Sequence, residues 1–301
     1  MALPEFVRPM LATLVDEPFD SPEHLFEIKW DGIRALCFLE GGGYRLLSRN
    51  RLDLAPAYPE LDFLRALEPG SVLDGELVVL EQGRSSFSRS LERVQAKNRL
   101  RIAALARSSP AVFVAFDLLY RHGAKLYDEP LRGRRAALRE VVNSAGNSRL
   151  AFSEGVEGTG QAFFDEVRAR GLEGMLAKEL TSSYLPGKRT RAWIKVKTTR
   201  TMPCLILGWL ADERGELRSL IIGAEEHGRL VCVGRVGSGL TDELRARLRE
   251  LCRARARSAP LVASAEEAHW IEPGLYCTVT YLERTENGLR APVFEELLEE
   301  A

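Results

Sequence analysis

Short apolar or alternating runs, separated by turn residues, recur through the first two hundred residues of the chain. These runs predict strands at residues 25–29, 44–48, 72–80, 111–120, 175–179 and 192–197. Helical periodicity occurs between them at residues 132–142 and 161–170, and Gly171 is typical of a helix C-terminus. The pattern therefore predicts a domain of mixed α and β structure.

The pattern changes after a polar stretch at residues 198–203, which ends in a proline and predicts a break between domains. Beyond it, apolar runs predict strands at residues 204–210, 217–223, 230–236 and 275–282. One helix is expected among them, because Thr241 is a typical helix cap and Leu244, Leu248 and Leu251 recur at helical spacing. Several strands with one helix favour a small barrel such as an OB-fold. We therefore expect an α+β protein of two domains, at residues 1–202 and 203–301.

Composition places the chain among globular proteins, with 45% hydrophobic and 28% charged residues. No apolar run approaches the roughly 20 residues that a membrane span needs, and residues 1–10 lack the apolar core of a secretion signal. We therefore expect a cytoplasmic protein with no membrane partner. The five cysteines are odd in number and widely scattered, which argues against a disulfide framework and against structural zinc.

Charge is unevenly distributed along the chain, although the formal net charge is only -1. Residues 1–202 hold 30 basic against 26 acidic residues, whereas residues 203–301 hold 12 against 17. Only seven of the 42 basic residues are lysines, and all seven precede residue 202. Because a guanidinium cannot act as an amine nucleophile, these lysines are candidates for amine chemistry, with a solvated surface charge as the simpler interpretation of each.

Lys29 lies at the end of a predicted strand, beside the turn residues Asp31 and Gly32. Taken alone, such a Lys-x-Asp-Gly motif is common at surface turns. It gains weight from an ordered series of further motifs, which are Ser48-Arg49-Asn50, Asp74-Gly75-Glu76, Phe116-Asp117, Glu173-Gly174-Met175-Leu176-Ala177-Lys178 and Trp193-Ile194-Lys195-Val196-Lys197. Four of the seven lysines, Lys29 included, fall within this set.

With these motifs in this order, the chain resembles the covalent nucleotidyltransferases and, within them, the ATP-dependent DNA ligases. The likeness is greatest to the ligase domain of the bacterial end-joining ligase D, and residues 8–12, 184–189 and 233–239 add to it. The resemblance implies an adenylation (nucleotidyltransferase) domain at residues 1–202 and an OB-fold domain at residues 203–301. It also implies a monomeric enzyme that uses ATP with Mg²⁺ or Mn²⁺, seals nicked double-stranded DNA, and works with Ku-type or other repair proteins.

The resemblance assigns roles to the lysines. It implies that Lys29 forms the covalent adduct with AMP, that Lys195 and Lys197 hold the α-phosphate, and that Asp31 lies near the reacting end. Attack on phosphorus needs an unprotonated amine, which neighbouring cations such as Lys178, Lys195 and Lys197 would favour. The alternate spacing of Lys195 and Lys197 is equally compatible with an exposed strand face.

The remaining motif residues are expected to bind the nucleotide, the metal or DNA. Because Mg²⁺ prefers oxygen ligands, Glu76 and Glu173 are expected to contact the metal or the ribose. Phe116 is expected to stack on adenine, with core packing as the alternative. The other residues that the resemblance places at the nucleotide or at the nick are Glu27, Arg34, Ser48, Arg49, Lys178 and Trp193.

The end of the chain departs from the family pattern. Arg290 to Phe294 match the front half of the family's last motif, but the following residues are acidic where the family has basic residues that orient pyrophosphate. An acidic tail repels a triphosphate, so this departure bears on self-adenylylation more than on the later steps, and Arg290 is left to supply part of the DNA- or phosphate-binding role. A divergent helix is an alternative interpretation of the tail.

Three other functions share most of these motifs. An RNA ligase or a capping enzyme has the same nucleotidyltransferase chemistry with a different acceptor or nucleotide. A ligase with weak self-adenylylation would act mainly on pre-adenylylated nicks. A non-catalytic nucleic-acid clamp is disfavoured by the presence of Lys29, Lys195 and Lys197.

Overall fold

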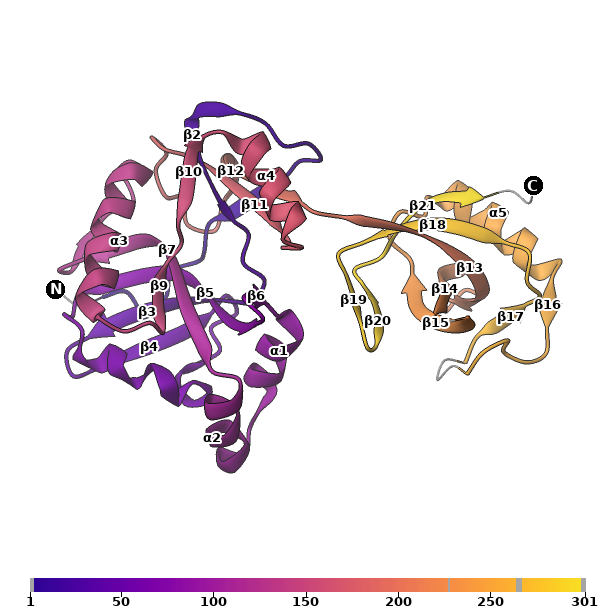
Figure 1. Cartoon of the computed structure of the whole chain (residues 1–301), viewed down its shortest axis with the longest axis horizontal. Helices are drawn as coiled ribbons and strands as arrows, with labels where there is room; N and C mark the ends of the chain where they lie inside the picture. Colours follow the sequence, from indigo (N-terminus) through magenta and orange to yellow (C-terminus); the bar gives the residue numbers. More distant parts are fainter. Residues whose placement is uncertain (1–2, 227, 264–266, 299–301) are drawn as a thin grey trace. The chain divides into compact units, whose positions relative to one another are not determined.

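The computed structural model (Figure 1) describes residues 3–226, 228–263 and 267–298. The chain forms two compact units, Met1–Thr198 and Thr199–Ala301. Strand β13 (Arg200–Ala211) begins directly after this division and pairs with β18 (Tyr276–Tyr281) from Arg200 onwards. Most of the stretch 198–203, where the polar composition predicts a break between domains, is therefore strand, because backbone pairing with β18 outweighs that composition.

The first unit contains two sheets, and the first has the strand order β1-β12-β11-β2-β10. Its strands are β1 (Leu11–Leu14), β2 (Ser21–Ile28), β10 (Gly155–Gly158), β11 (Gly174–Glu179) and β12 (Arg189–Lys197). Helix α4 (Gly160–Ala169) packs on one face of this sheet, where its Phe164 joins a buried cluster with Phe26, Met175 and Ile194. The opposite face is therefore free to carry the site.

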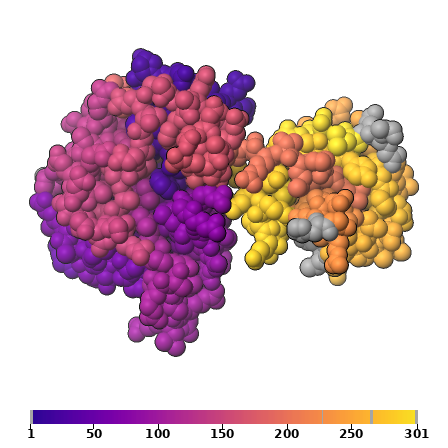
Figure 2. Space-filling model, viewed as in Figure 1, coloured from indigo at the N-terminus to yellow at the C-terminus, as the bar shows by residue number. Residues whose placement is uncertain are grey.

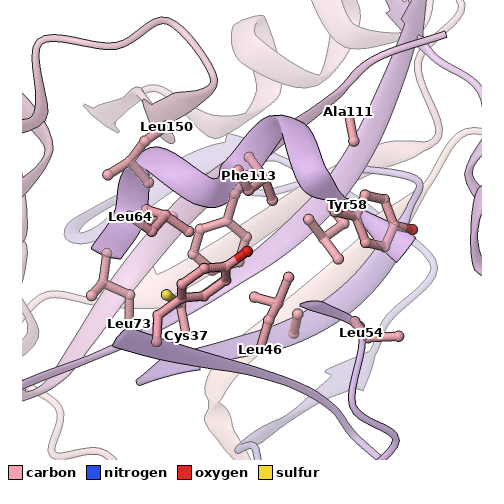
Figure 3. Close-up of a cluster of buried hydrophobic side chains, with 14 of the residues drawn as sticks. Cys37, Leu46, Leu54, Tyr58, Leu64, Leu73, Ala111, Phe113 and Leu150 are labelled. Atoms are coloured by element: carbon pink, nitrogen blue, oxygen red, sulfur yellow. The ribbon is translucent and has the colours of Figure 1, made fainter. Parts of the chain in front are cut away.

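The second sheet has the order β4-β3-β5-β7-β8, with β6 beside β5 and β9 beside β7. Its strands are β3 (Ile33–Glu40), β4 (Gly43–Ser48), β5 (Ser71–Glu81), β6 (Arg84–Ser85), β7 (Ala111–Arg121), β8 (Ala124–Lys125) and β9 (Leu150–Phe152). Helix α3 (Leu131–Ala145) and the 3-10 segments η1 (Ala55–Ala57) and η2 (Pro59–Ala66) pack against this sheet. Figure 3 shows the resulting core, in which Cys37, Leu73 and Phe113 lie beside Leu64 of η2.

A third cluster contains buried residues from both sheets and so joins them. Leu36 and Phe116 come from the second sheet, Trp193 comes from the first, and Met10 and Tyr184 come from neighbouring segments. Helices α1 (Phe87–Gln95) and α2 (Arg99–Ser108) lie between β6 and β7 in the chain. In Figure 1, α2 lies farther from the sheets of this unit than α1 does.

The second unit is mostly β structure around one helix, as predicted. Its main sheet runs β15-β14-β13-β17-β16, with β18 between β13 and β21, and β19 pairs with β20. The further elements are β14 (Leu217–Glu226), β15 (Arg229–Val236), α5 (Asp242–Arg253), β16 (Ala256–Arg257), β17 (His269–Ile271), β19 (Glu283–Thr285), β20 (Gly288–Arg290) and β21 (Val293–Leu298). The hydroxyl of Thr241 accepts a hydrogen bond from the N–H of Leu244 at 3.2 Å, so the predicted cap is present.

The helix considered for the tail is wrong over residues 293–298, which form strand β21. Phe294 is buried opposite Val279 of β18, whereas Glu295 and Glu296 are exposed. A strand thus buries the aromatic ring and leaves the carboxylates in water, which explains why the acidic sequence is tolerated here. The last three residues, 299–301, which include Glu299 and Glu300, lie outside the described residues. Within the part of the chain that the structure describes, no helix is long and apolar enough to cross a membrane.

Candidate active site

One face of the first sheet gathers five of the predicted site residues. Side chains alternate between the two faces of a strand, and directly opposed residues of neighbouring strands share a face. Leu176 of β11 lies opposite both Glu27 of β2 and Lys195 of β12. The same face therefore carries Glu27, Lys178, Trp193, Lys195 and Lys197.

Lys29 follows β2 directly and forms an ion pair with Glu173, which precedes β11. The two side chains are 21% and 6% exposed, so the amine remains accessible while its partner is buried. The N–H of Lys29 also donates to the carbonyl of Gly174 at 2.9 Å. Gly174 has φ +155°, and a Cβ atom there would lie 2.2 Å from the carbonyl oxygen of Val196. Only glycine therefore lets β11 approach β12 and hold the Lys29 backbone at this point.

The turn after Lys29 is fixed by its neighbours. The indole N–H of Trp30 donates to the Ser153 hydroxyl at 3.0 Å, and the N–H of Asp31 donates to the Ser85 hydroxyl at 3.3 Å. A Cβ atom on Gly32 would lie 2.2 Å from the carbonyl oxygen of Leu77, so the turn sits directly against β5. The Lys-x-Asp-Gly motif is thus packed against the second sheet and is not a free surface turn.

Glu27 is fully buried and bound to two cations. Its carboxylate accepts a hydrogen bond from Arg135 of α3 at 2.8 Å and forms an ion pair with Lys178. Arg135 also donates to the carbonyl oxygens of Phe116 at 3.3 Å and Ser153 at 2.6 Å. Burial lowers the pKa of Lys178, although Glu27 opposes that shift. Glu27 therefore contacts protein cations at the place where the resemblance puts adenine.

The aromatic pair of the site surrounds a cation. Phe116 is only 4% exposed, and its ring lies edge-on to Trp193 with 6.1 Å between centroids. The Lys178 ammonium lies 4.2 Å from each ring centroid, a cation–π geometry. The buried indole N–H of Trp193 has no hydrogen-bond partner among the described residues. Phe116 thus packs in the core, and its stacking on adenine stays a prediction. The buried indole N–H beside it is a donor that a ligand could engage.

Arg34 belongs to a network that the sequence did not indicate. It donates to both carboxylate oxygens of Asp74, at 3.0 and 2.6 Å, and to the carbonyl of Met10 at 2.7 Å. The Tyr184 hydroxyl donates to the same carboxylate at 2.7 Å. Although burial disfavours its charge, Asp74 raises the pKa of Arg34 above its ordinary value. These contacts make Arg34 a half-buried anchor of the second sheet.

Carboxylates and amines near Lys29 influence one another's charge. The pKa of Glu76 is raised to about 8. Burial is the main cause and the charges of Asp74 and Glu173 add to it, whereas Arg34 and Lys29 oppose the shift. Burial also lowers the pKa of Lys195, and the positive charges of Lys197 and Lys29 add to that effect. The predicted catalytic lysines and the two predicted metal carboxylates therefore form one electrostatic cluster.

The two carboxylates of this cluster fit a metal ion whose other ligands are phosphate oxygens and water. Among the described residues, no three Asp, Glu, His or Cys side chains gather closely enough to hold a metal alone. Mg²⁺ is commonly bound by one or two carboxylates with phosphate oxygens and water completing its shell. Glu76 and Glu173 could supply that pair once Glu76 is ionised and Glu173 is released from Lys29.

Two predicted DNA-binding residues of the first unit, Ser48 and Arg49, are not part of this cluster, and the third, Arg290, belongs to the second unit. The Ser48 hydroxyl accepts hydrogen bonds from the N–H groups of Leu52 at 3.0 Å and Asn50 at 3.3 Å, so it stabilises its own turn. Arg49 is exposed in that turn at the end of β4. Arg290 lies in the second unit, where it donates to Glu283 at 3.4 Å across the β19–β20 hairpin.

Sequence reasoning gave no role to four residues that hold the site together, which are Asp74, Arg134, Arg135 and Tyr184, although Asp74 and Tyr184 lie in motifs that carry the family resemblance. Arg134 binds both carboxylate oxygens of Asp117, at 2.8 and 2.9 Å, and is fully buried. One available indication was α3 itself, where Arg134 and Arg135 occupy buried positions between Leu131 and Leu138. Adjacent arginines on an apolar helix face indicate buried carboxylates elsewhere in the chain.

Both parts of the chain match models of one family. Residues 9–197 match the ATP dependent DNA ligase domain, and residues 213–300 match the ATP dependent DNA ligase C terminal region. The chain belongs to the ATP-dependent DNA ligase family. The prediction of a nucleotidyltransferase domain followed by an OB-fold type domain is thereby confirmed.

Among relatives of this ligase family, the multifunctional non-homologous end joining protein LigD of Pseudomonas aeruginosa is 34% identical over 99% of the chain. The chain spans only 36% of that protein's length. DNA ligase C of Mycobacterium tuberculosis is 34% identical over 88% of the chain, which covers 73% of that ligase. The solved ligase domain of M. tuberculosis LigD matches 97% of the chain, and 95% of its own length, with 32% identity and a TM-score of 0.58.

Proposed function

We propose that this chain seals nicks in duplex DNA with ATP, and that Lys29 is the nucleophile. The observation that carries the proposal is the placement of Lys29 against Glu173, beside Lys195 and Lys197 on one sheet face, within the part that matches the ligase domain. A lysine that is both accessible and surrounded by cations is suited to attack a phosphoryl centre.

In the first proposed step, the Lys29 amine attacks the α-phosphorus of ATP. A nitrogen–phosphorus bond forms, the bond to the bridging oxygen breaks, pyrophosphate leaves and the amine proton passes to water. Lys195 and Lys197 are the cations that would stabilise the charge that develops on the α-phosphate oxygens. Glu173, which pairs with Lys29 in this structure, is in position to hold the amine before attack.

In the second step, an oxygen of the 5′-phosphate at a nick attacks the same phosphorus. The nitrogen–phosphorus bond breaks, and Lys29 recovers a proton. In the third step, the 3′-hydroxyl attacks the 5′-phosphorus, a phosphodiester bond forms and AMP leaves. Because Lys29 must meet first ATP and then a DNA end, we propose a hinge within the predicted break 198–203, at residues 198–199, which precede β13.

The nucleotide would occupy the side of the first sheet where Glu27, Phe116, Lys178 and Trp193 meet. The unpartnered indole N–H of Trp193 and the cation–π contact of Lys178 support this assignment, since both are groups that a ligand can engage. Glu76 and Glu173 would hold Mg²⁺ or Mn²⁺, whose chemistry is to neutralise phosphate charge. Ser48, Arg49 and Arg290 remain predictions as DNA contacts.

End joining is the proposed pathway. It is supported by the printed names of the LigD relatives, each of which is described as a non-homologous end joining protein. A Ku-type protein is the corresponding proposed partner, and a monomer acting at the bacterial nucleoid is the proposed working form. These proposals extend from relatives that are longer than this chain.

The acidic β21 strand favours a second candidate, which is a ligase that acts mainly on pre-adenylylated nicks. Glu295 and Glu296 are exposed where family members have basic residues for the pyrophosphate. Carboxylates there would oppose ATP activation and would leave the last step unaffected, because pyrophosphate takes part only in the first.

The test is a sealing assay on matched substrates with purified full-length chain. Nicked duplex DNA with ATP and Mg²⁺ should be joined, whereas the same duplex with GTP should not. A nick between RNA strands should be joined at least about 10-fold more slowly. Faster joining of RNA would move the assignment to an RNA ligase, and use of GTP would move it to a capping-type enzyme.

A further inference from the structure

The segment from residue 84 to residue 107 is strongly basic, although the chain as a whole is nearly neutral. It contains seven basic residues and one acidic residue, Glu92, whereas the whole chain has a net charge of -1. The basic residues are Arg84, Arg89, Arg93, Lys97, Arg99, Arg101 and Arg107. The segment contains β6, α1 and α2, and we call it the basic arm.

Three arginines of the basic arm have structural partners. Arg93 is 1% exposed and binds Glu60 at 2.8 Å. This ion pair anchors α1 to η2, which packs against the second sheet. Arg89 and Arg101 both contact Glu92, each at 3.2 Å, so one carboxylate links α1 to α2. These contacts hold the arm in shape and neutralise only part of its charge.

The other four basic residues are available to a partner. Arg84, Lys97, Arg99 and Arg107 are all exposed, and none makes an ion pair within the described part of the chain. Arg99 and Arg107 lie on the same helix, about 12 Å apart along its axis at ~1.5 Å per residue. No acidic residue that the structure describes pairs with these four cations, so the arm can contact several negative charges of one partner.

The basic arm begins at the active site. Ser85, next to Arg84, accepts a hydrogen bond from the N–H of Asp31, two residues after Lys29. From there α1 and α2 extend outward, and Figure 2 shows them as a lobe that protrudes from the first unit. The side chain of Asn98 caps α2 and thereby fixes the helix that carries Arg99 and Arg107.

We propose that the basic arm binds the phosphates of duplex DNA beside the nick. The proposal rests on the proposed function, which brings a DNA end to Lys29. Duplex DNA carries one negative charge per ~1.7 Å, so a duplex that lay along the arm from Lys29 would present a dense row of negative charges to the exposed cations. Exposed Leu100, at 82%, is the feature that a protein partner would use, but the surrounding charge favours a polyanion.

The test measures binding of a nicked 30-base-pair duplex by fluorescence anisotropy at several salt concentrations. A 5′-hydroxyl at the nick prevents transfer, so only binding is observed. The arm variant carries Arg84→Gln, Lys97→Gln, Arg99→Gln and Arg107→Gln. The control variant loses the same charge elsewhere on the first unit, through Arg132→Gln, Arg139→Gln, Arg168→Gln and Arg170→Gln, four arginines in exposed ion pairs.

Each phosphate contact contributes ~0.9 to the slope of log affinity against log salt. The arm variant should therefore lose about 2 to 4 from that slope and at least about 10-fold in affinity, while the control variant changes the slope by less than ~1. Both variants should still be labelled by ATP at the wild-type level, because that step needs no DNA. This labelling also establishes that each variant is folded.

An arm variant that binds like the control variant, with full labelling by ATP, overturns the assignment of the arm. The proposed function would then stand, because the wild-type chain would still bind and seal nicked DNA. Failure of the wild-type chain to bind nicked DNA would overturn both proposals.

Discussion

Glu27, Arg135 and Lys178 illustrate how the site depends on buried charges that compensate one another. Two of these three side chains are fully buried and Arg135 is 7% exposed. A charge in the protein interior costs several kcal/mol unless it is paired and hydrogen-bonded. Arg135 satisfies Glu27 and two backbone carbonyls at once, one of them from Phe116. It therefore links β2 of the first sheet to β7 of the second.

Replacing Arg135 by alanine should lower the free energy of unfolding by about 3 to 5 kcal/mol, because Glu27 keeps its charge and loses a partner. Arg139→Ala is the matched control on the same helix. Its ion pair with Glu154 is exposed, so the expected loss is below about 1 kcal/mol. Urea denaturation of both variants measures the difference. Equal losses would show that the Glu27 pair does not hold the two sheets together.

Glu76 should make stability depend on pH. Its folded-state pKa of about 8 exceeds the ordinary value of 4.5, so the folded protein binds an extra proton between those values. The stabilisation is present below pH ~4.5 and is lost as the pH rises through about 8. Removing this group by Glu76→Gln should therefore become progressively more favourable from pH 5 to pH 8, by at most ~1.4 kcal/mol per pH unit.

The measurement is the difference in free energy of unfolding between Glu76→Gln and wild type, without metal or nucleotide. Glu81→Gln is the control, because hydrogen bonds from Ser86 and Arg89 hold the pKa of Glu81 below its ordinary value. Glu81 is ionised in both states over this range, so its difference should stay constant. A flat profile for Glu76→Gln would contradict the assignment of a neutral Glu76 at low pH.

Among single residues, the sequence predicted those that belong to motifs. It did not predict the pairs that form only when distant segments of the chain pack together. Lys29, Lys195 and Lys197 were predicted together and share one electrostatic cluster. Arg135 and Glu27 are 108 residues apart, and Tyr184 and Asp74 are 110 apart. Such pairs depend on how α3 and the segment before β12 pack on the sheets, which no local pattern records.

Among the elements, alternation predicted the long strands well because each has one face in a core. Strand β3 was not predicted, although its residues 35–39 are all buried, since a continuous apolar run does not by itself distinguish a strand from a helix. Helix α1 was missed although Phe87, Leu91 and Val94 recur at helical spacing, and α2 was missed because none of its residues is buried. The basic arm therefore became visible only in the structure.

Strand β11 depends on a glycine where it begins. Gly174→Ala should cost about 2 to 4 kcal/mol, because the added Cβ atom meets the Val196 carbonyl and φ +155° is strained for other residues. Gly133→Ala in α3 is the control. Its Cβ atom would meet nothing within 4 Å, so this change should stabilise by up to about 1 kcal/mol.

Thermal unfolding of both glycine variants measures the change, and labelling by ATP provides a second readout. Gly174→Ala should lose labelling more than its stability loss explains, since Gly174 also accepts the hydrogen bond from the Lys29 N–H. Full labelling in a folded Gly174→Ala variant would show that Lys29 is positioned without this contact.

For the whole molecule, the two units contribute different charges to one reaction. The first unit supplies Lys29 and a slightly basic surface, whereas the second contains an excess of acidic residues that continues into β21. The near-neutral net charge is therefore an average over two dissimilar parts. DNA binding has to rely on local basic surfaces such as the basic arm.

The acidic β21 strand should separate the steps of the reaction. A pre-adenylylated nick should be sealed about 10-fold faster or more than a plain nick with ATP, because only the plain nick needs pyrophosphate to be oriented. The double variant Glu295→Lys, Glu296→Lys should lower the ratio of these two sealing rates, because the rate on plain nicks should rise. Rapid-quench measurement of both substrates tests this. Equal wild-type rates on the two nicks would show that the tail does not limit activation.

Lys29 is expected to become covalently bound to AMP. Incubation with ATP labelled at the α-phosphate, followed by denaturing electrophoresis, should leave label on the wild-type chain and on Lys125→Ala, whose lysine is exposed outside the site. Lys29→Ala should carry no label, and circular dichroism checks that this variant is folded, because the buried Glu173 loses its partner. Label that persists on folded Lys29→Ala, or its absence from the wild-type chain, would contradict the account.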